Sequence, residues 1–89
     1  MPEGRPKRRR AAALRYEGEG APKVTASGAG LIADKILASA REAGIPVRED
    51  AALVEALAQL QLGTEIPDAL YDAVAETLAW AYRLDAKRP

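Results

Sequence analysis

The chain has 89 residues, a length that supports at most one domain with a modest hydrophobic core. Hydrophobic residues make up 48% of it and charged residues 29%, the formal net charge is zero, and there is no Cys and no His. This composition excludes disulfides, thiolate chemistry and the usual metal ligands, so we expect no cofactor. No apolar run approaches the roughly 18 residues of a membrane span, and we expect a soluble cytoplasmic protein.

Residues 1–10 form a basic N-terminal segment with five basic residues, one Glu, two Pro and one Gly. Like charges together with Pro and Gly predict a flexible arm. Such an arm suits an electrostatic contact with nucleic acid, acidic lipid or an acidic protein face. A solvated tail that keeps a small neutral protein soluble is the favoured interpretation, because the cluster is short and has no interleaved aromatic residues.

The next segment, Ala11 to Tyr16, is ambiguous by periodicity, and its alanines alone favour a helix. A turn-forming stretch, Glu17 to Gly20, follows directly, and a new extended segment begins soon after it. We therefore predict a strand that forms a hairpin-like pair with Lys23 to Ala26. Pro22 suits the first position of that second strand, where no ladder donor is needed.

Residues 22–48 organise the chain as strand, helix and strand. A tight turn at Gly28 and Gly30 leads from Lys23–Ala26 into a helix that Gly44 ends, and Ile45–Arg48 is predicted to be a second strand. Two strands joined by a helix should lie parallel, with a right-handed crossover. The two glycines are not a dinucleotide fingerprint, because the third glycine is absent. The predicted buried stripe of the helix is Ala29, Ile32, Ala33, Ile36, Leu37 and Ala40.

Two further helices are predicted. Asp50 is the expected N-cap of the first, which Gly63 ends, and Pro67 begins the second. Their expected inner faces comprise Leu53, Leu57 and Leu60 in the first helix and Leu70, Val74, Thr77, Leu78 and Ala81 in the second. Three aromatic residues form a partial rim, which is more often the edge of a small core than a partner contact: Tyr71, Trp80 and Tyr82.

These elements predict an α/β fold, a small mixed sheet of about three strands packed with three helices. The expected organisation is a basic arm over 1–10, one domain over 11–84 and a frayed tail over 85–89.

Three stretches carry a resemblance to a known family: PKVTASGAGLIADKI, AGIPVRED and LGTEIPDALYDAVAETLAWAYRL. In order and spacing they resemble the C-terminal cytoplasmic domain of the FlhB-type export switch proteins of flagellar and virulence type III secretion. The resemblance covers about 11–84 and is most specific over Gly63–Tyr71. Ser27 stands where that family usually has Lys.

The resemblance also has two larger departures. The family's membrane-spanning half has no counterpart here, and neither has its self-cleaving Asn-Pro-Thr-His motif, whose four positions align with Pro6 to Arg9. Cleavage in that family requires the Asn, and this sequence contains none. The resemblance therefore implies a free-standing counterpart of the downstream fragment, without self-cleavage.

The resemblance further implies that a strand upstream of the cleavage motif is missing, which would leave an unpaired sheet edge. We expect a non-enzymatic accessory component of an export apparatus that binds apparatus proteins, export substrates or the upstream fragment of a full-length FlhB-type protein, or that forms a homodimer through this edge. The alternative is a small nucleic-acid-associated protein that uses the basic arm. An enzyme is disfavoured, because no His, Cys or converging carboxylate pair is present. The candidate partner-binding residues are Arg8, Arg9, Arg10, Ala11, Ala12, Ala13, Leu14, Arg15 and Tyr16.

Overall fold

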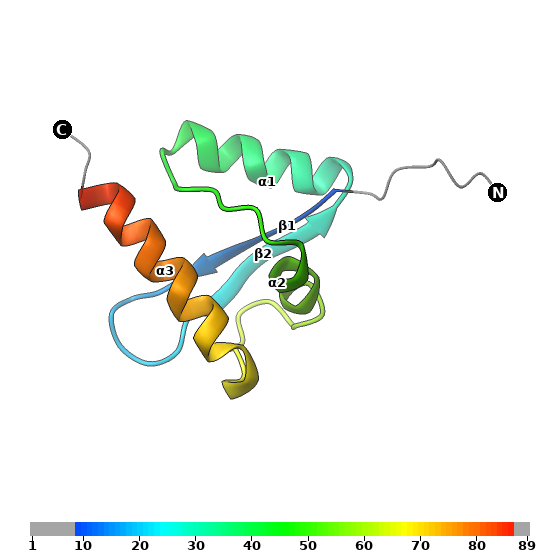
Figure 1. The fold of residues 1–89 in the computed structure, drawn as a ribbon. Helices are drawn as coiled ribbons and strands as arrows, with labels where there is room; N and C mark the ends of the chain where they lie inside the picture. The colour runs from blue at the N-terminus through cyan, green and yellow to red at the C-terminus, as the bar shows by residue number, and fades with distance from the viewer. Residues whose placement is uncertain (1–8, 87–89) are drawn as a thin grey trace.

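The computed structural model describes residues 9–86, which fold into a β-hairpin between helices (Figure 1). The hairpin consists of β1 (Arg10–Arg15) and β2 (Lys23–Ala29). The helices are α1 (Leu31–Glu42), α2 (Ala51–Leu57) and α3 (Tyr71–Ala86), with a short 3-10 turn, η1 (Asp68–Leu70), directly before α3. Within the described residues, no helix is long and apolar enough to cross a membrane.

The predicted hairpin is present, and its strands are antiparallel. The register runs from Arg10 opposite Ala29 to Arg15 opposite Lys23. It shifts once between Ala13 and Leu14. The connecting turn contains Gly18 and Gly20, both with positive φ (93° and 73°), so the sequence signal at Glu17–Gly20 has a direct conformational cause.

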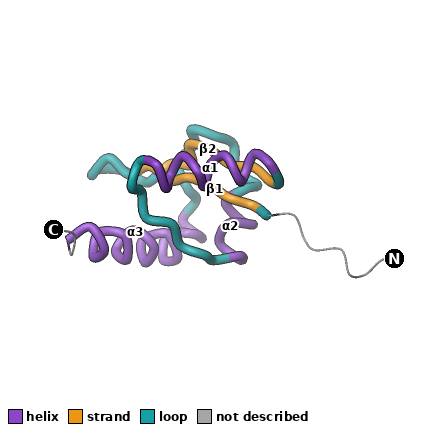
Figure 2. The backbone as a smooth tube through the Cα atoms, turned by 90° about the horizontal axis from the view of Figure 1, so that it is seen from above, coloured by secondary structure: helices purple, strands orange, loops and turns teal. Residues whose placement is uncertain are grey.

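The hairpin lies between two helical layers. Helix α1 crosses one face of the hairpin, while α2 and α3 lie on the other side (Figures 1 and 2). The main core occupies the α2–α3 side, where Ala12 and Leu14 of β1 pack against the buried cluster. That cluster consists of Val24, Leu53, Leu57, Ile66 and Val74. The predicted inner faces of the second and third helices are therefore largely correct.

Helix α1 ends where the sequence indicates. Gly44 has φ 72°, and the Ile45 N–H donates to the Ala40 carbonyl (2.8 Å) while the Gly44 N–H donates to the Arg41 carbonyl (3.2 Å). This pair of bonds is the Schellman arrangement that a glycine after a helix permits.

The predicted buried stripe of α1 is wrong at Ile32. Ala33 is fully buried and Ile36, Leu37 and Ala40 are half-buried, but Ile32 is 58% exposed. The helix starts at Leu31, so Ile32 lies in its first turn, over Gly28 at the end of the hairpin. A Cβ at Gly28 would collide with Ile32, so the glycine lets the helix approach the strand closely.

Two helix boundaries also differ from the prediction. Asp50 is the N-cap of α2, since its Oδ1 accepts from the Leu53 N–H (3.0 Å), but α2 ends at Leu57 instead of continuing to Gly63. Pro67 precedes η1, and the α-helical turns start only at Tyr71. Residues 58–66 instead form turns that return to the sheet, where the Gly63 N–H donates to the Val24 carbonyl (2.8 Å).

The predicted third strand, Ile45–Arg48, is not part of the sheet, which has two strands and not about three. The segment is irregular, although it runs in the same direction as β2, as the predicted crossover requires (Figure 1). It has no strand neighbour to pair with, so the parallel pairing does not form. The fold is therefore mixed α/β with three helices, as expected, around a smaller sheet. The predicted arm (1–10) and tail (85–89) lie largely within residues 1–8 and 87–89, outside the described residues.

Candidate protein-binding edge and groove

The candidate partner-binding residues that the structure describes lie on and around β1. Arg10 to Arg15 form the strand itself, Arg9 precedes it and Tyr16 follows it. Ala11 is buried, the next three residues are half-buried, and the flanking arginines and Tyr16 are exposed. Arg8 lies outside the described residues. The strand thus offers a backbone edge and small side chains, with charge at its ends.

The two edges of the sheet differ sharply. The outer edge of β2 is closed by residues 63–66: besides the bond from Gly63, the Ile66 N–H donates to the Pro22 carbonyl (3.0 Å), and Lys23 forms a β-bridge with Glu65. Within residues 9–86, the outer edge of β1 pairs with no strand. The sheet therefore has one protected edge and one open edge, and the open edge is the one predicted from the sequence.

The alternation of an antiparallel ladder indicates which backbone groups of β1 face outward. The Gly30 N–H donates to the Arg9 carbonyl (2.8 Å), so Arg9 and Gly30 oppose each other at a hydrogen-bonded position. Ala11 and Ala13, two and four residues later, then also direct their N–H and C=O groups toward β2. The N–H and C=O groups of Arg10, Ala12 and Leu14 point away from β2. Of the two neighbouring alanines, Ala12 therefore presents its N–H to a partner, whereas the Ala13 N–H faces β2.

The open edge of β1 lies in a large groove, which we call the edge groove. Its volume is about 1560 Å³, above the roughly 300–1,000 Å³ of small-molecule pockets. Residues of α1, α2, α3 and the segment 43–50 line it together with β1. Helix α1 lies on one side of the hairpin, α2 and α3 lie on the other, and the segment after α1 runs beside β1 (Figures 1 and 2). Most of the helical lining is apolar and comes from Ile36, Leu37, Ala40, Leu53, Val54, Leu78 and Trp80. The groove is therefore a gap beside β1 at the level of the sheet, with helices on both faces of the sheet.

Charges around β1 are partly paired at the surface. Arg9 lies 3.6 Å from the Asp34 carboxylate, and Arg15 lies 3.2 Å from that of Glu17, with all four side chains more than half exposed. Exposed pairs of this kind contribute little stability. They leave Arg10, for which no carboxylate of the described residues lies within ion-pair distance, beside the open edge.

A second concave surface lies at the other end of the hairpin, and we call it the tyrosine hollow. Tyr16, Tyr71 and Tyr82 contribute to its lining, together with Pro22, Ile66 and Ala75. Its volume is about 340 Å³. Tyr71, Trp80 and Tyr82 were predicted to form one rim, but Trp80 lines the edge groove instead. The sequence pattern did not indicate that Tyr16 belongs to this surface, because Tyr16 lies beside α3 only in the folded hairpin.

Within residues 9–86, no three His, Cys, Asp or Glu side chains gather closely enough to hold a metal ion. The described concave surfaces are lined mainly by apolar and small side chains. Their arrangement supports binding through backbone groups and apolar contact.

The fold and its edges thus define a small α/β domain whose sheet is closed on one side and open on the other. The profile of the FlhB HrpN YscU SpaS family matches residues 8–81. The chain belongs to this family, as the resemblance predicted.

Individual relatives agree with this assignment. The chain is 44% identical over 79 residues to "Uncharacterized protein YlqH" of Bacillus subtilis, a match that covers 86% of this chain and 85% of the relative. It is 44% identical over 75 residues to "Flagellar biosynthetic protein FlhB" of Escherichia coli and 45% identical over 75 residues to that of Salmonella typhimurium. Both of these matches cover 81% of this chain but only 20% of the relative. The chain therefore spans a fifth of the flagellar proteins and most of YlqH.

Proposed function

We propose that this protein is a non-enzymatic, cytoplasmic component of a type III protein export apparatus that acts by binding another protein through the open edge of β1. The family match over residues 8–81 supports a role related to export. The observation that carries the binding mode is the asymmetry of the sheet: residues 63–66 close the edge of β2, while the edge of β1 opens into the edge groove.

The proposed mode of binding is strand addition. An extended segment of the partner pairs with the outward N–H and C=O groups of Arg10, Ala12 and Leu14, and backbone hydrogen bonds supply much of the affinity. The partner we favour is the upstream fragment of a full-length FlhB-type protein. Strand addition would let this chain take the place of, or compete with, the corresponding segment of that protein during substrate export or specificity switching.

Two proline substitutions test this mode. Ala12→Pro removes an N–H that faces outward, so the hairpin should still fold while binding is lost. Ala13→Pro removes an N–H that faces β2, so it should destabilise the hairpin itself. The measurement is co-purification with the upstream fragment of the full-length FlhB-type protein, together with circular dichroism of both variants. Folded Ala12→Pro protein that binds as well as the wild type would refute strand addition at β1.

A second measurement on the same variants distinguishes binding of the upstream fragment from self-association. Sedimentation at several protein concentrations shows whether the wild type forms a dimer through β1. A dimer that Ala12→Pro dissociates would mean that the edge pairs with a second copy. A monomer without affinity for the upstream fragment would contradict the proposed partner.

The tyrosine hollow supports a second contact, with export substrates. Its lining combines apolar surface with tyrosine rings, and tyrosines are enriched in protein interfaces because an apolar ring carries a polar tip. Ala75 is exposed on α3 within this lining. Ala75→Asp should therefore reduce substrate binding, while the control Ala38→Asp, at an exposed position of α1, should not. Equal substrate binding by both variants would contradict a contact between the tyrosine hollow and export substrates.

A further inference from the structure

Two adjacent apolar side chains at the start of α1 are exposed outside both concave surfaces. Leu31 is 78% exposed and Ile32 is 58% exposed, and neither lines the edge groove or the tyrosine hollow. Leu31 is the most exposed large hydrophobic side chain of the described residues. Single exposed apolar residues are common on soluble proteins, but two neighbours at one end of the fold make a small apolar patch. We call Leu31 and Ile32 the α1 tip.

Basic side chains lie around the α1 tip. The Gly30 N–H donates to the Arg9 carbonyl (2.8 Å), so the start of β1 is held directly beside the start of α1. Lys35 is exposed and lies one turn after Leu31 on the same face of the helix. Neither Arg10 nor Lys35 forms an ion pair with a carboxylate of the described residues. The apolar tip therefore has uncompensated positive charge on both sides of it.

The carboxylates near the tip do not cancel this charge. Asp34 is the acidic residue in the first turn of α1, and it lies 3.6 Å from the Arg9 guanidinium. The other carboxylate of α1, Glu42, belongs to the last residue of the helix. Residues 1–8, which precede Arg9 in the chain, add three basic residues and one Glu. The net charge at this end of the chain is therefore positive.

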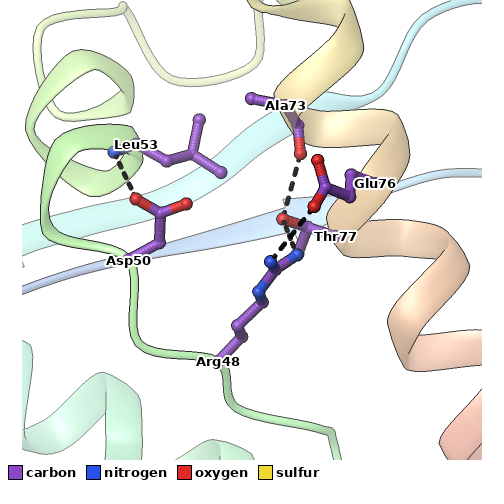
Figure 3. A network of polar contacts seen from close by, with 6 residues as sticks. All are labelled: Arg48, Asp50, Leu53, Ala73, Glu76 and Thr77. Atoms are coloured by element: carbon purple, nitrogen blue, oxygen red, sulfur yellow. Dashed lines mark hydrogen bonds and ion pairs between the residues drawn. The ribbon is translucent and has the colours of Figure 1, made fainter.

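The opposite layer of the fold has its arginine already occupied (Figure 3). The Arg48 Nη1 donates to the Thr77 hydroxyl (3.2 Å), and its Nη2 lies 3.5 Å from a Glu76 carboxylate oxygen. Its guanidinium carbon lies 5.9 Å from the centre of the Trp80 ring. The far end of the hairpin is acidic, since the turn between β1 and β2 and the segment that closes β2 carry Glu17, Glu19 and Glu65. The charge of the molecule is therefore polarised, with its positive end at the α1 tip.

We propose that the α1 tip docks on the surface of a membrane that contains anionic phospholipids. Leu31 and Ile32 insert at the level of the headgroups, while Lys35 and the basic residues of 5–10 contact the lipid phosphates. Together these are six Lys and Arg residues, within the roughly four to eight that are typical of basic clusters that bind anionic lipid. Docking at the tip requires neither strand addition at β1 nor the tyrosine hollow, so it is tested independently of the proposed function.

The size of the tip favours a membrane over a protein partner. A stable protein interface covers about 800 Å² on each partner, and two aliphatic side chains supply only a small part of that area. A bilayer needs no matching pocket, because aliphatic side chains can enter its headgroup region wherever they meet it. Nucleic acid would attract the same positive charges but offers the two aliphatic side chains no apolar environment. An anionic bilayer uses both features of the tip.

Co-sedimentation with vesicles tests the apolar contact. The wild type should sediment with vesicles of phosphatidylcholine and phosphatidylglycerol but not with phosphatidylcholine alone, and added salt should weaken the binding. Leu31→Gln should lower the partition coefficient roughly tenfold, because the leucine side chain no longer leaves water. Leu62→Gln is the matched control, since Leu62 is also exposed (56%) but lies in the turn next to Gly63, toward the other end of β2. Circular dichroism shows whether both variants are folded.

A second pair of variants tests the charges. Lys35→Gln should lower the partition coefficient about fivefold, because one basic side chain is lost from the membrane surface. Arg83→Gln is the control, because Arg83 is exposed in the last turns of α3 and lies away from the tip (Figure 1). Equal losses in the two variants would mean that the whole molecule is attracted without a defined orientation, which would overturn docking at the tip.

A fluorescent label reports insertion directly. The chain contains no Cys, so Leu31→Cys can carry a single nitrobenzoxadiazole group. On vesicles with phosphatidylglycerol its emission should become stronger and shift to shorter wavelength, while the same label on Leu62→Cys should not change. Equal vesicle binding by the wild type and Leu31→Gln, with no change at the label, would mean that the basic residues alone hold the protein and would overturn the proposal. Binding to duplex DNA without binding to the anionic vesicles would also overturn it, in favour of a nucleic-acid partner.

Discussion

Leu57 offers the sharpest test of the assigned core. It is 3% exposed and belongs to the buried cluster with Val24, Ile66 and Val74. Leu57→Ala should lower the free energy of unfolding by about 2–5 kcal/mol, since a buried leucine loses both its transfer free energy and its contacts around the resulting cavity. A domain of this size has a total stability of roughly 4–13 kcal/mol at the usual value per residue, so the variant should lose a large part of it.

Leu62 supplies the matched control, because it lies five residues away and is 56% exposed. Leu62→Ala should change the free energy of unfolding by less than about 0.5 kcal/mol. Urea unfolding, followed by circular dichroism and by Trp80 fluorescence, measures both variants. If Leu57→Ala proves too unstable to purify, Ile66→Val at a position 4% exposed should cost about 0.5–1.5 kcal/mol. Equal midpoints for Leu57→Ala and Leu62→Ala would refute the assignment of the buried face of α2.

Three further predictions follow from local features. Asp50→Ala should cost about 1 kcal/mol of stability in urea unfolding, because it removes the side-chain acceptor for the Leu53 N–H, and an unchanged midpoint would contradict the cap. Gly28→Ala should destabilise the protein through its collision with Ile32, and the additional change Ile32→Ala should restore most of the loss; additive losses in the double variant would contradict the contact. The intact mass should stay constant during long incubation at neutral and alkaline pH, because the chain contains no Asn; a specific cut near Arg9 in protease-free protein would disprove this.

The alternative function, binding of nucleic acid by the basic arm, predicts a measurable affinity for DNA. If it holds, affinity for duplex DNA falls steeply with salt and disappears on deletion of residues 1–10. We expect only weak binding at low salt, since Arg9 and Arg15 already lie beside carboxylates. Tight binding at physiological salt would favour the nucleic-acid function over the export function.

Local signals predicted the elements of this fold well. The turn glycines identified the hairpin, Asp50 identified the start of α2, and Gly44 identified the end of α1. Each of these residues acts on the backbone within a few positions of itself, so a single sequence is enough to recognise it. The open edge of β1 was also predictable, because the family resemblance indicated a missing neighbour strand.

The errors concern contacts between distant parts of the chain. Ile32 fits the helical stripe, yet it lies over Gly28 near the end of β2, where the missing side chain of the glycine leaves it 58% exposed. Ile45–Arg48 has the composition of a strand, but a strand also needs a neighbour within hydrogen-bonding distance, and the edge groove lies between it and β1. Trp80 was predicted to lie in one rim with Tyr71 and Tyr82, but it lines a different surface. A helical pattern does not specify which neighbouring elements each side of the helix contacts. Periodicity identifies the buried side of an element but not the partner that buries it.

The open groove links binding to stability, which gives the last prediction. Within residues 9–86, the outward backbone groups of β1 pair with no strand, and the apolar lining of the groove is only partly covered, so the free domain should be only marginally stable. A segment that binds the folded chain alone stabilises it by about 2.7 kcal/mol at 100 times its dissociation constant. For a domain of this size, that corresponds to a rise in melting temperature on the order of ten degrees. Differential scanning calorimetry of the wild type, titrated with the upstream fragment of a full-length FlhB-type protein, should show this rise. Ala12→Pro should melt within a few degrees of the wild type when free and should show no rise with the fragment. A wild-type melting temperature that is already high and does not respond to the fragment would mean that the groove is a stable feature of the free protein and that the proposed partner is wrong.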